Sequence, residues 1–300
     1  MKVFITGATG YIGLNVAAVY RRAGHEVWGL TRSPEKARLL ARHEIRPVQG
    51  SMQDPGSWGE TARKCSVLIH AAVDYQEDPF KLDHRTVEFL LSIARQEGPR
   101  PKTLIYTSGV WVYGSTGGAL ADETTPLNPP KLVAPRPGIE RMVLESGDVR
   151  GIVLRPGCVY GYQGGLTGMW FAGAVSEKSL KAVGDGRNRW AMVHADDLAD
   201  AYLRAGESGL AGEVFNVTDR SRASVREMLA AVAGATGYQG EIRFVPVAEA
   251  TAKMGHFAEC LALDQHVDAR KAVRLLGWQP RHGGFADEVE SCLLSWQAAR

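Results

Sequence analysis

The amino-terminal residues carry the clearest chemical pattern in the chain. Three glycines are spaced over seven residues, between a strand-like apolar run and a helix-like stretch. Glycines at such a junction allow a sharp turn and a close approach of the backbone to a pyrophosphate, while the helix N-terminus offers free N–H groups and a positive dipole. We therefore expect a dinucleotide to contact Gly7, Thr9, Gly10, Tyr11, Ile12 and Gly13.

The end of the second predicted strand indicates which dinucleotide binds. An acidic residue about twenty positions after the glycines is typical of NAD sites, because it binds the ribose hydroxyls. This chain instead has Thr31, Arg32 and Ser33, with no acidic residue before Glu35. Arg32 can form paired charge-assisted hydrogen bonds with a 2′-phosphate, and the two hydroxyls can add donors. The pattern favours NADP, with a solvated strand-end arginine as the alternative.

Short strands and helices alternate over the first half of the chain. Apolar runs of about five residues are separated by stretches with helical periodicity, which is typical of a parallel sheet covered on both faces. We expect strands at 2–6, 26–31, 45–49, 66–70 and 103–107, and helices at 14–22, 34–42 and 79–97, with a short helix from about 54.

The second half of the chain alternates less regularly. Glycines and prolines between 114 and 137 predict a loop over the sheet edge. We expect a further strand at 151–155 and helices at 138–146, 196–206, 224–235 and 285–296. The predicted fold class is α/β, a Rossmann-type doubly wound parallel sheet with a smaller C-terminal α+β lobe. The dinucleotide-binding domain is assigned to 1–155 plus about 192–217, and the substrate-binding lobe to 156–191 and 218–300.

Composition excludes several functional classes. The 300 residues carry 35 Lys+Arg and 33 Asp+Glu, a net charge of +2, without a basic stripe that would indicate nucleic acid. No apolar run approaches the roughly eighteen residues of a membrane helix, and the chain opens on a strand-like run rather than a signal peptide. The four cysteines form no Cys-x-x-Cys pair, which indicates reduced thiols. We expect a cytoplasmic protein that acts on small molecules, without nucleic-acid or membrane partners.

Six segments together resemble one known family. They are Thr6–Gly13, Val67–Ala72, Tyr106–Gly114, Leu154–Gly161, Val193–Ala199 and Val214–Val217. In this order, over nearly the whole chain, they resemble the extended short-chain dehydrogenase/reductase superfamily, in particular its epimerase/dehydratase-like group. The resemblance implies a Rossmann fold, a helix-pair homodimer in similar proteins, and further cofactor contacts from Ser51, Met52, Ala71, Ala72, Val73, Thr107, Arg136, Pro156 and Val159.

The resemblance does not extend to the usual catalytic residues. Family members that reduce a carbonyl use a Ser or Thr, a Tyr, and a Lys four residues after the Tyr. Aligning the motifs places Gly109, Leu132 and Arg136 at these positions, and no Tyr-x-x-x-Lys occurs between Gly114 and Arg150. The pattern is similar to that of atypical members, which keep the glycine motif and lack this triad.

Three residues are candidates to replace the triad. The phenol of Tyr113 can donate a proton without a neighbouring lysine, although a packed aromatic is the alternative. Ser108 lies one residue from the expected serine, but alternation along the strand would turn it to the opposite face. Arg136 can hold the nicotinamide ribose or an anionic substrate, but it cannot act as a base. A solvated arginine at the helix start is the alternative for Arg136.

Further residues are candidates for a substrate pocket. Arg189 lies in a glycine-bracketed run that resembles the segment of sugar-nucleotide members that contacts the substrate pyrophosphate, with a plain hairpin turn as the alternative. Aromatic side chains in the irregular half can line a pocket for a planar substrate, although most can also be core. We assign the substrate site to Trp111, Tyr160, Trp170, Arg189 and Trp190.

A histidine and two aspartates could suggest a metal site. His194, Asp196 and Asp197 lie within four residues of one another. In similar family segments this stretch caps a helix, with an aspartate accepting backbone N–H groups. We therefore expect a helix cap here and no metal.

Three functions from different classes are compatible with these residues. The first is an NADP-dependent oxidoreductase of the atypical class that reduces a small carbonyl, enone or imine-type substrate. The second is a non-redox sugar-nucleotide epimerase, isomerase or lyase, which Arg189 supports. The third is an NADP-binding sensor without turnover, which the missing triad supports. The first is our prediction.

Overall fold

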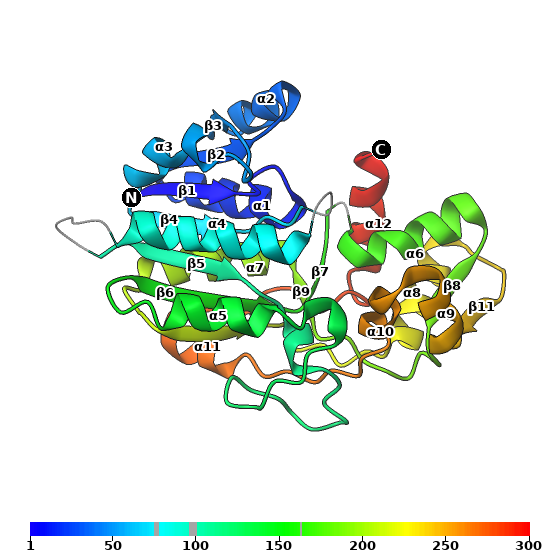
Figure 1. Cartoon of the computed structure of the whole chain (residues 1–300). Coiled ribbons are helices and arrows are strands. Elements are labelled where there is room, and N and C mark those ends of the chain that lie inside the picture. The colour runs from blue at the N-terminus through cyan, green and yellow to red at the C-terminus, as the bar shows by residue number, and fades with distance from the viewer. Residues whose placement is uncertain (75–77, 96–100, 163) are drawn as a thin grey trace.

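The protein is built around one parallel sheet. The computed structural model describes residues 1–74, 78–95, 101–162 and 164–300 (Figure 1). Seven strands follow the order β10-β6-β5-β4-β1-β2-β3, and every adjacent pair is parallel. The strands are β1 (Lys2–Thr6), β2 (Glu26–Thr31), β3 (Arg46–Gln49), β4 (Val67–His70), β5 (Thr103–Thr107), β6 (Arg150–Pro156) and β10 (Glu213–Val217). The predicted doubly wound sheet is therefore confirmed.

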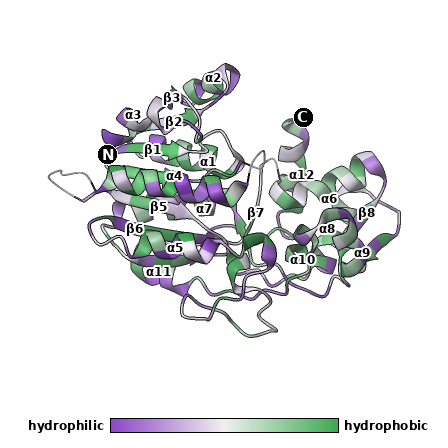
Figure 2. Ribbon diagram, viewed as in Figure 1, coloured by the Kyte–Doolittle hydropathy of each residue, from purple (hydrophilic) through white to green (hydrophobic). Residues whose placement is uncertain are grey.

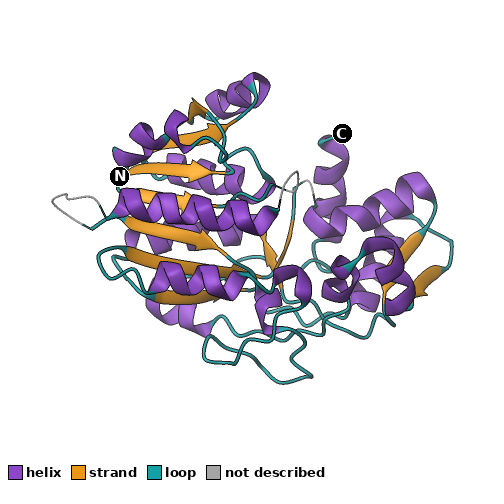
Figure 3. Cartoon of the chain, viewed as in Figure 1, coloured by secondary structure: helices purple, strands orange, loops and turns teal. Residues whose placement is uncertain are grey.

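Helices cover both faces of this sheet (Figure 3). Alternate residues of β1 enter two separate cores, since Val3 and Ile5 pack with α1 and α7 on one face, whereas Phe4 packs with α3 and α4 on the other. Figure 2 shows hydrophobic residues along the sheet and hydrophilic ones on outward helix turns. The helices of this part are α1 (Tyr11–Arg22), α2 (Pro34–Arg42), α3 (Gly59–Arg63), α4 (Pro79–Ala94), α5 (Arg136–Leu144), α7 (Ala195–Glu207) and α11 (Arg270–Leu276).

A second apolar core lies beyond the carboxyl edge of the sheet. It includes the side chains of Trp170, Trp190, Phe285 and Trp296. Two small parallel pairs, β7 with β9 and β8 with β11, belong to this region (Figure 1). Its elements are β7 (Cys158–Tyr160), α6 (Gly168–Ala172), β8 (Leu180–Val183), β9 (Met192–His194), α8 (Val225–Thr236), β11 (Ile242–Val245), α9 (Val247–Met254), α10 (His256–Leu261) and α12 (Val289–Ala298). The exact domain boundaries stay a prediction.

Short 3-10 and π turns fill the connections. The loop after β5 contains two 3-10 turns before α5 begins, as the glycines and prolines there predicted. The helix α1 starts at Tyr11, three residues earlier than predicted, because its first turn is part of the glycine turn itself. The 3-10 turns are Pro55–Ser57, Val110–Tyr113, Lys131–Val133 and Gly165–Thr167, and the π turn is Gly173–Glu177.

A buried ion pair ties the sheet to the loop after β5. The side chains of Arg155 and Glu140 are 5% and 2% exposed, and two hydrogen bonds of 3.0 and 2.5 Å join them. The third donor of Arg155 reaches the Tyr113 hydroxyl at 2.7 Å, and this hydroxyl donates to the Asn216 amide oxygen at 2.8 Å. This hydrogen-bonded group therefore connects α5, β6, the loop after β5 and β10.

Replacing Glu140 with glutamine is expected to lower the free energy of unfolding by about 3 kcal/mol or more, because the Arg155 guanidinium would stay buried without its counter-charge. Urea unfolding followed by circular dichroism measures this loss. Glu145→Gln, at the exposed end of the same helix, is the control and should stay within about 0.5 kcal/mol of wild type. Equal stability of the two variants would contradict the role of the pair.

Candidate active site

The glycine turn between β1 and α1 is packed backbone against backbone. A Cβ atom added to Gly7 would lie 2.4 Å from the Ala71 carbonyl oxygen, and one added to Gly13 would lie 2.1 Å from the Gly7 oxygen. The N-terminus of α1, at Gly10, has no side-chain cap. Its first N–H groups are therefore left for a ligand, and the bare backbone lets a pyrophosphate approach them. These residues fit a dinucleotide.

The end of β2 places Arg32 where the sequence predicted it. The Arg32 side chain is 57% exposed, and its Nη1 lies 2.6 Å from the Asp74 carboxylate in the loop after β4. Gln53 donates to the same carboxylate oxygen at 3.3 Å. Ser33 caps α2 by accepting from the Lys36 amide. Arg32 therefore lies at the strand end, more than half exposed, with Nη1 paired to Asp74.

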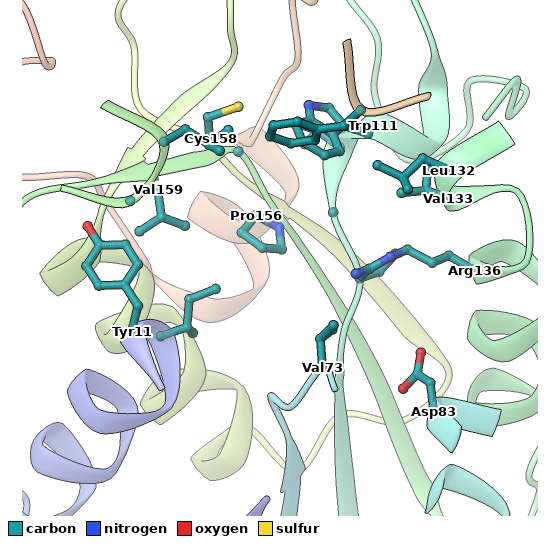
Figure 4. A pocket seen from close by; sticks show the side chains of 18 of the residues that line it. Tyr11, Val73, Asp83, Trp111, Leu132, Val133, Arg136, Pro156, Cys158 and Val159 are labelled. Atoms are coloured by element: carbon teal, nitrogen blue, oxygen red, sulfur yellow. The ribbon is translucent and has the colours of Figure 1, made fainter. Parts of the chain in front are cut away.

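A cavity of about 800 Å³ lies at the carboxyl edge of the sheet, next to the glycine turn (Figure 4). Its wall is mainly apolar and includes Trp111 and Phe257, whose rings meet edge to face at 6.1 Å. The structure brings together eight of the predicted site residues here: Tyr11, Ile12, Val73, Ser108, Trp111, Arg136, Pro156 and Val159. Lining residues that the sequence did not single out include Phe80, Asp83, Val133, Cys158, Leu166 and Phe257.

Ser108 faces this cavity, so the expectation that strand alternation turns it away is wrong. The strand β5 ends at Thr107, and the rule of alternation no longer applies to the next residue. Ser108 is 5% exposed, and its hydroxyl has no hydrogen-bond partner within the described structure. A buried, unpartnered hydroxyl on a cavity wall is a ready partner for a ligand.

Arg136 lines the same cavity from the first residue of α5. Its Nη1 donates to the Thr107 carbonyl oxygen at 3.1 Å. Its Nε is buried and has no partner among the described atoms. The guanidinium is thus anchored to the strand end that precedes Ser108, with one donor unused.

Tyr113 lies outside the described lining of the cavity, which contradicts its predicted part as a proton donor. It is 3% exposed, and its hydroxyl is engaged by both Arg155 and Asn216. Burial raises the pKa of this phenol, while the contact with Arg155 opposes the rise. Tyr113 therefore fits the alternative interpretation, in which it is an aromatic side chain packed in the core.

Four predicted substrate residues also lie outside the described cavity lining. Tyr160 is fully buried in the second core, and Trp170 and Trp190 stack there at 4.9 Å, beside a separate cavity of about 470 Å³. Arg189 forms a forked pair with Asp264, with Nε and Nη2 at 3.0 and 2.9 Å from its two oxygens. The Arg189 guanidinium, which we expected to contact a substrate pyrophosphate, is therefore paired with a carboxylate. The reason is that the loop that carries Asp264 folds against the turn that carries Arg189.

The predicted helix cap at residues 194–197 is correct in place but wrong in residue. The imidazole of His194, rather than an aspartate, caps α7 by accepting from the Asp196 amide at 3.1 Å. Asp197 instead accepts from the amides of Arg281 and His282. Burial lowers the pKa of His194, and the neighbouring His282 lowers it further.

His194, His282 and Glu288 have potential metal-ligand atoms within 4.8 Å of one another. The two imidazole rings are stacked at 3.5 Å with an angle of 17° between their planes. The in-plane lone pairs of stacked rings run side by side and do not converge on one ion. Glu288 accepts from the Gly283 amide and lies 2.7 Å from the Nδ1 of His282. The cluster is explained by hydrogen bonding and stacking.

The same buried region contains an unusual carboxyl group. Asp219 is 8% exposed, and its Oδ2, like the Tyr160 hydroxyl, has no partner among the described atoms. Burial raises the pKa of Asp219 to about 7, although hydrogen bonds from Ser221 oppose the rise. Asp197 and Glu288 lie close enough to add to it.

The fold and the glycine turn define a Rossmann-type nucleotide-binding protein. The model of the NAD dependent epimerase/dehydratase family matches residues 3–218, and the chain belongs to this family of NAD(P)-dependent enzymes. Among the described helices, none combines the length and the apolarity needed to cross a bilayer.

The relatives of this chain include both a reductase and an epimerase. It is 28% identical over 294 residues to 4-hydroxy-2-methyl-3-oxo-4-farnesyl-3,4-dihydroquinoline-1-oxide ketoreductase of Stigmatella aurantiaca, covering 92% of this chain and 87% of that one. It is 28% identical over 317 residues to UDP-glucose 4-epimerase of Mycolicibacterium smegmatis, covering 97% and 98%. The solved UDP-glucose 4-epimerase of Thermus thermophilus in complex with NAD has the same fold, with a TM-score of 0.84 at 21% identity over the whole of both chains.

Replacing Asp219 with asparagine is expected to stabilise the protein increasingly from about pH 4 to about pH 7, and by a constant amount above that. Between the ordinary aspartate pKa and about 7, the folded protein holds a proton that the unfolded chain has released, so stability falls as the pH rises through this window. Asparagine cannot ionise, and the variant should gain about 4 kcal/mol at pH 8 and nothing near pH 3. Thermal unfolding at a series of pH values measures the difference. Asp185→Asn, an exposed aspartate, is the control, and a gain independent of pH would contradict the assignment.

Proposed function

We propose that this protein is an NADP-dependent reductase of a small carbonyl, enone or imine-type compound. The observation that carries the proposal is the apolar cavity beside the glycine turn, lined by Ser108 and Arg136, each of which has a buried polar atom without a partner among the described residues. The ketoreductase among the relatives supports the same reaction class. A cytoplasmic location and a homodimer stay predictions.

NADPH, when bound, supplies the hydride, and the remaining requirements fall to the chain. The glycine turn binds the pyrophosphate through backbone amides. Arg32 binds the 2′-phosphate, with Thr31 and Ser33 beside it. Pro156, Val159 and Val73 border the cavity and position the nicotinamide end against the substrate. Met52 and Ser51, in the loop after β3, are proposed contacts of the adenine end.

The family triad is replaced by different chemistry under this proposal. Gly109, Leu132 and Arg136, which the motif alignment puts at the triad positions, all line the cavity. Loss of a general acid costs about 10²- to 10⁴-fold in rate for a poorly activated substrate. The enzyme is therefore suited to compounds in which the charge that develops is delocalised, such as enones and quinones.

A sugar-nucleotide substrate is less compatible with these residues. Such a substrate brings a pyrophosphate, and the arginine that was to bind it, Arg189, is paired with Asp264. The charged residues in the described cavity lining are Asp83 and Arg136. Neither of them forms an obvious pyrophosphate site, whereas the aromatic wall suits a flat apolar body.

NADPH oxidation, followed by absorbance, is expected to accelerate with at least one member of a panel of quinones, enones, imines and ketones. Activated members should react faster than simple ketones, because a simple ketone depends more on the proton that the family's catalytic tyrosine would supply. UDP-glucose and a TDP-sugar serve as comparison ligands in calorimetry, and tight binding of either would favour the epimerase. Stabilisation by NADPH without turnover of any panel member would favour the sensor.

Replacing Arg32 with alanine is expected to weaken NADPH binding about tenfold to a hundredfold and to leave NADH binding nearly unchanged, because only NADPH carries the 2′-phosphate. Isothermal titration calorimetry with both nucleotides measures the two affinities. Arg38→Ala, an exposed arginine on α2, controls for a general loss of positive charge. Equal weakening of both nucleotides by Arg32→Ala would contradict the assignment of NADP.

A further inference from the structure

Two residues of one cavity wall each have a buried polar atom without a partner among the described residues. The Ser108 hydroxyl and the Arg136 Nε are both buried, and both residues line the 800 Å³ cavity. Buried donors in native proteins are nearly always satisfied, and leaving one unmade costs free energy. Both residues line a space large enough for a small molecule. A ligand in the cavity is therefore the natural hydrogen-bond partner for these two residues.

The two groups are held at one strand end. The Arg136 guanidinium donates to the carbonyl of Thr107, the residue directly before Ser108. Thr107 is itself fixed, because its hydroxyl lies 2.6 Å from both the His70 carbonyl oxygen and the Tyr202 hydroxyl. Arg136 is also the first residue of α5 and is followed by Pro137, which limits the backbone there. Both donors are thus preorganised before any ligand arrives.

Among the described residues, no ion pair joins Arg136 to Asp83, the other charged residue of the cavity lining. Both oxygens of Asp83 are engaged elsewhere, one 2.7 Å from His70 Nε2 and the other accepting from the Tyr106 hydroxyl at 2.7 Å. No ion pair of Arg136 occurs among the described residues. A guanidinium in an apolar wall favours an anion or an oxygen that gains negative charge.

The rest of the cavity wall is apolar and favours an uncharged, apolar ligand surface. Trp111 and Phe257 meet edge to face, and Leu166 lines the same wall. Leu132 and Val133 add to this apolar surface (Figure 4). Such a surface excludes a highly hydrated ligand and accepts a flat aromatic or conjugated body. The ligand must therefore combine an apolar plane with one strongly polar oxygen.

We infer that Ser108 and Arg136 form an oxygen-binding pair, which holds the carbonyl or oxyanion oxygen of a flat aromatic or conjugated substrate. The inference rests on the proposed reductase for the identity of that ligand as substrate. Arg136 cannot lose its proton, so it stabilises the charge that reaches the oxygen when hydride is added to the carbon skeleton. The proton that completes the reduced product comes from water.

The affinity for 2-naphthoate, a flat aromatic oxyanion, tests the pair by calorimetry, with and without oxidised NADP. Naphthalene, which lacks the oxygen, is the matched probe. Arg136→Met is expected to weaken 2-naphthoate about tenfold to a hundredfold, and Ser108→Ala about tenfold, because each removes a donor to a charged acceptor. Neither change should alter naphthalene binding more than about twofold.

Control variants separate this effect from general damage. Arg141→Met removes an exposed arginine from the same helix, and Ser115→Ala removes an exposed serine from the same loop. Both should bind 2-naphthoate as wild type does. Arg136→Lys keeps the charge but loses the Nε donor, and an intermediate affinity is expected. Thermal unfolding checks that every variant is folded.

The possible outcomes distinguish the pair from the reductase. If 2-naphthoate does not bind wild type, or binds all folded variants equally, the oxygen-binding pair is wrong, whatever the turnover. If the variants weaken 2-naphthoate as expected and no carbonyl compound is reduced, the pair stands and the reductase proposal fails. If the variants weakened naphthalene binding as much as 2-naphthoate binding, the oxygen-binding pair would also be wrong. The loss of affinity would then be due to a change in the shape of the cavity.

Discussion

The backbone contact between the glycine turn and the loop after β4 is the constraint on which the site depends. The strand β1 pairs with β2 on one side and β4 on the other, so the connections diverge at its carboxyl end. At Gly7 and Gly13 no side chain can be placed, because neighbouring backbone atoms occupy the space. The missing side chains let the turn between β1 and α1 pack tightly against its neighbours. This turn lies where the strand order reverses, which is where open α/β sheets bind dinucleotides.

A buried polar network fixes the strand ends beneath the cavity. The Thr6 hydroxyl lies 2.5 Å from His70 Nδ1, and His70 Nε2 lies 2.7 Å from Asp83, which also accepts from Tyr106. These residues belong to β1, β4, α4 and β5, and all are at most 6% exposed. In such surroundings each hydrogen bond is strong and a broken one is costly. The network engages both oxygens of the Asp83 carboxylate on the side of the strand ends.

Local patterns in the sequence predicted the fold and the glycine turn, because spacing along one segment determines both. Partners far apart in the chain could not be predicted. The sequence makes Tyr113 a plausible proton donor, but it does not reveal the hydroxyl's two partners. These are Arg155 and Asn216, which lie 42 and 103 residues away in the chain. Arg189 meets Asp264, 75 residues later, and Phe257 reaches the cavity from the C-terminal lobe. Alternation failed at Ser108 because the strand had already ended.

Under the proposed function, a guanidinium at the position that the motif alignment gives to the family lysine would change what the site can do. The family lysine lowers the pKa of a phenol, which then passes a proton to the substrate oxygen. A guanidinium keeps its protons and offers charge and direction instead. Simple ketones, whose product alkoxide needs a proton at once, lose most from this exchange. Conjugated carbonyls spread the charge and can accept a proton from water later, so under this proposal Arg136 would select substrates by electronic structure as well as by shape.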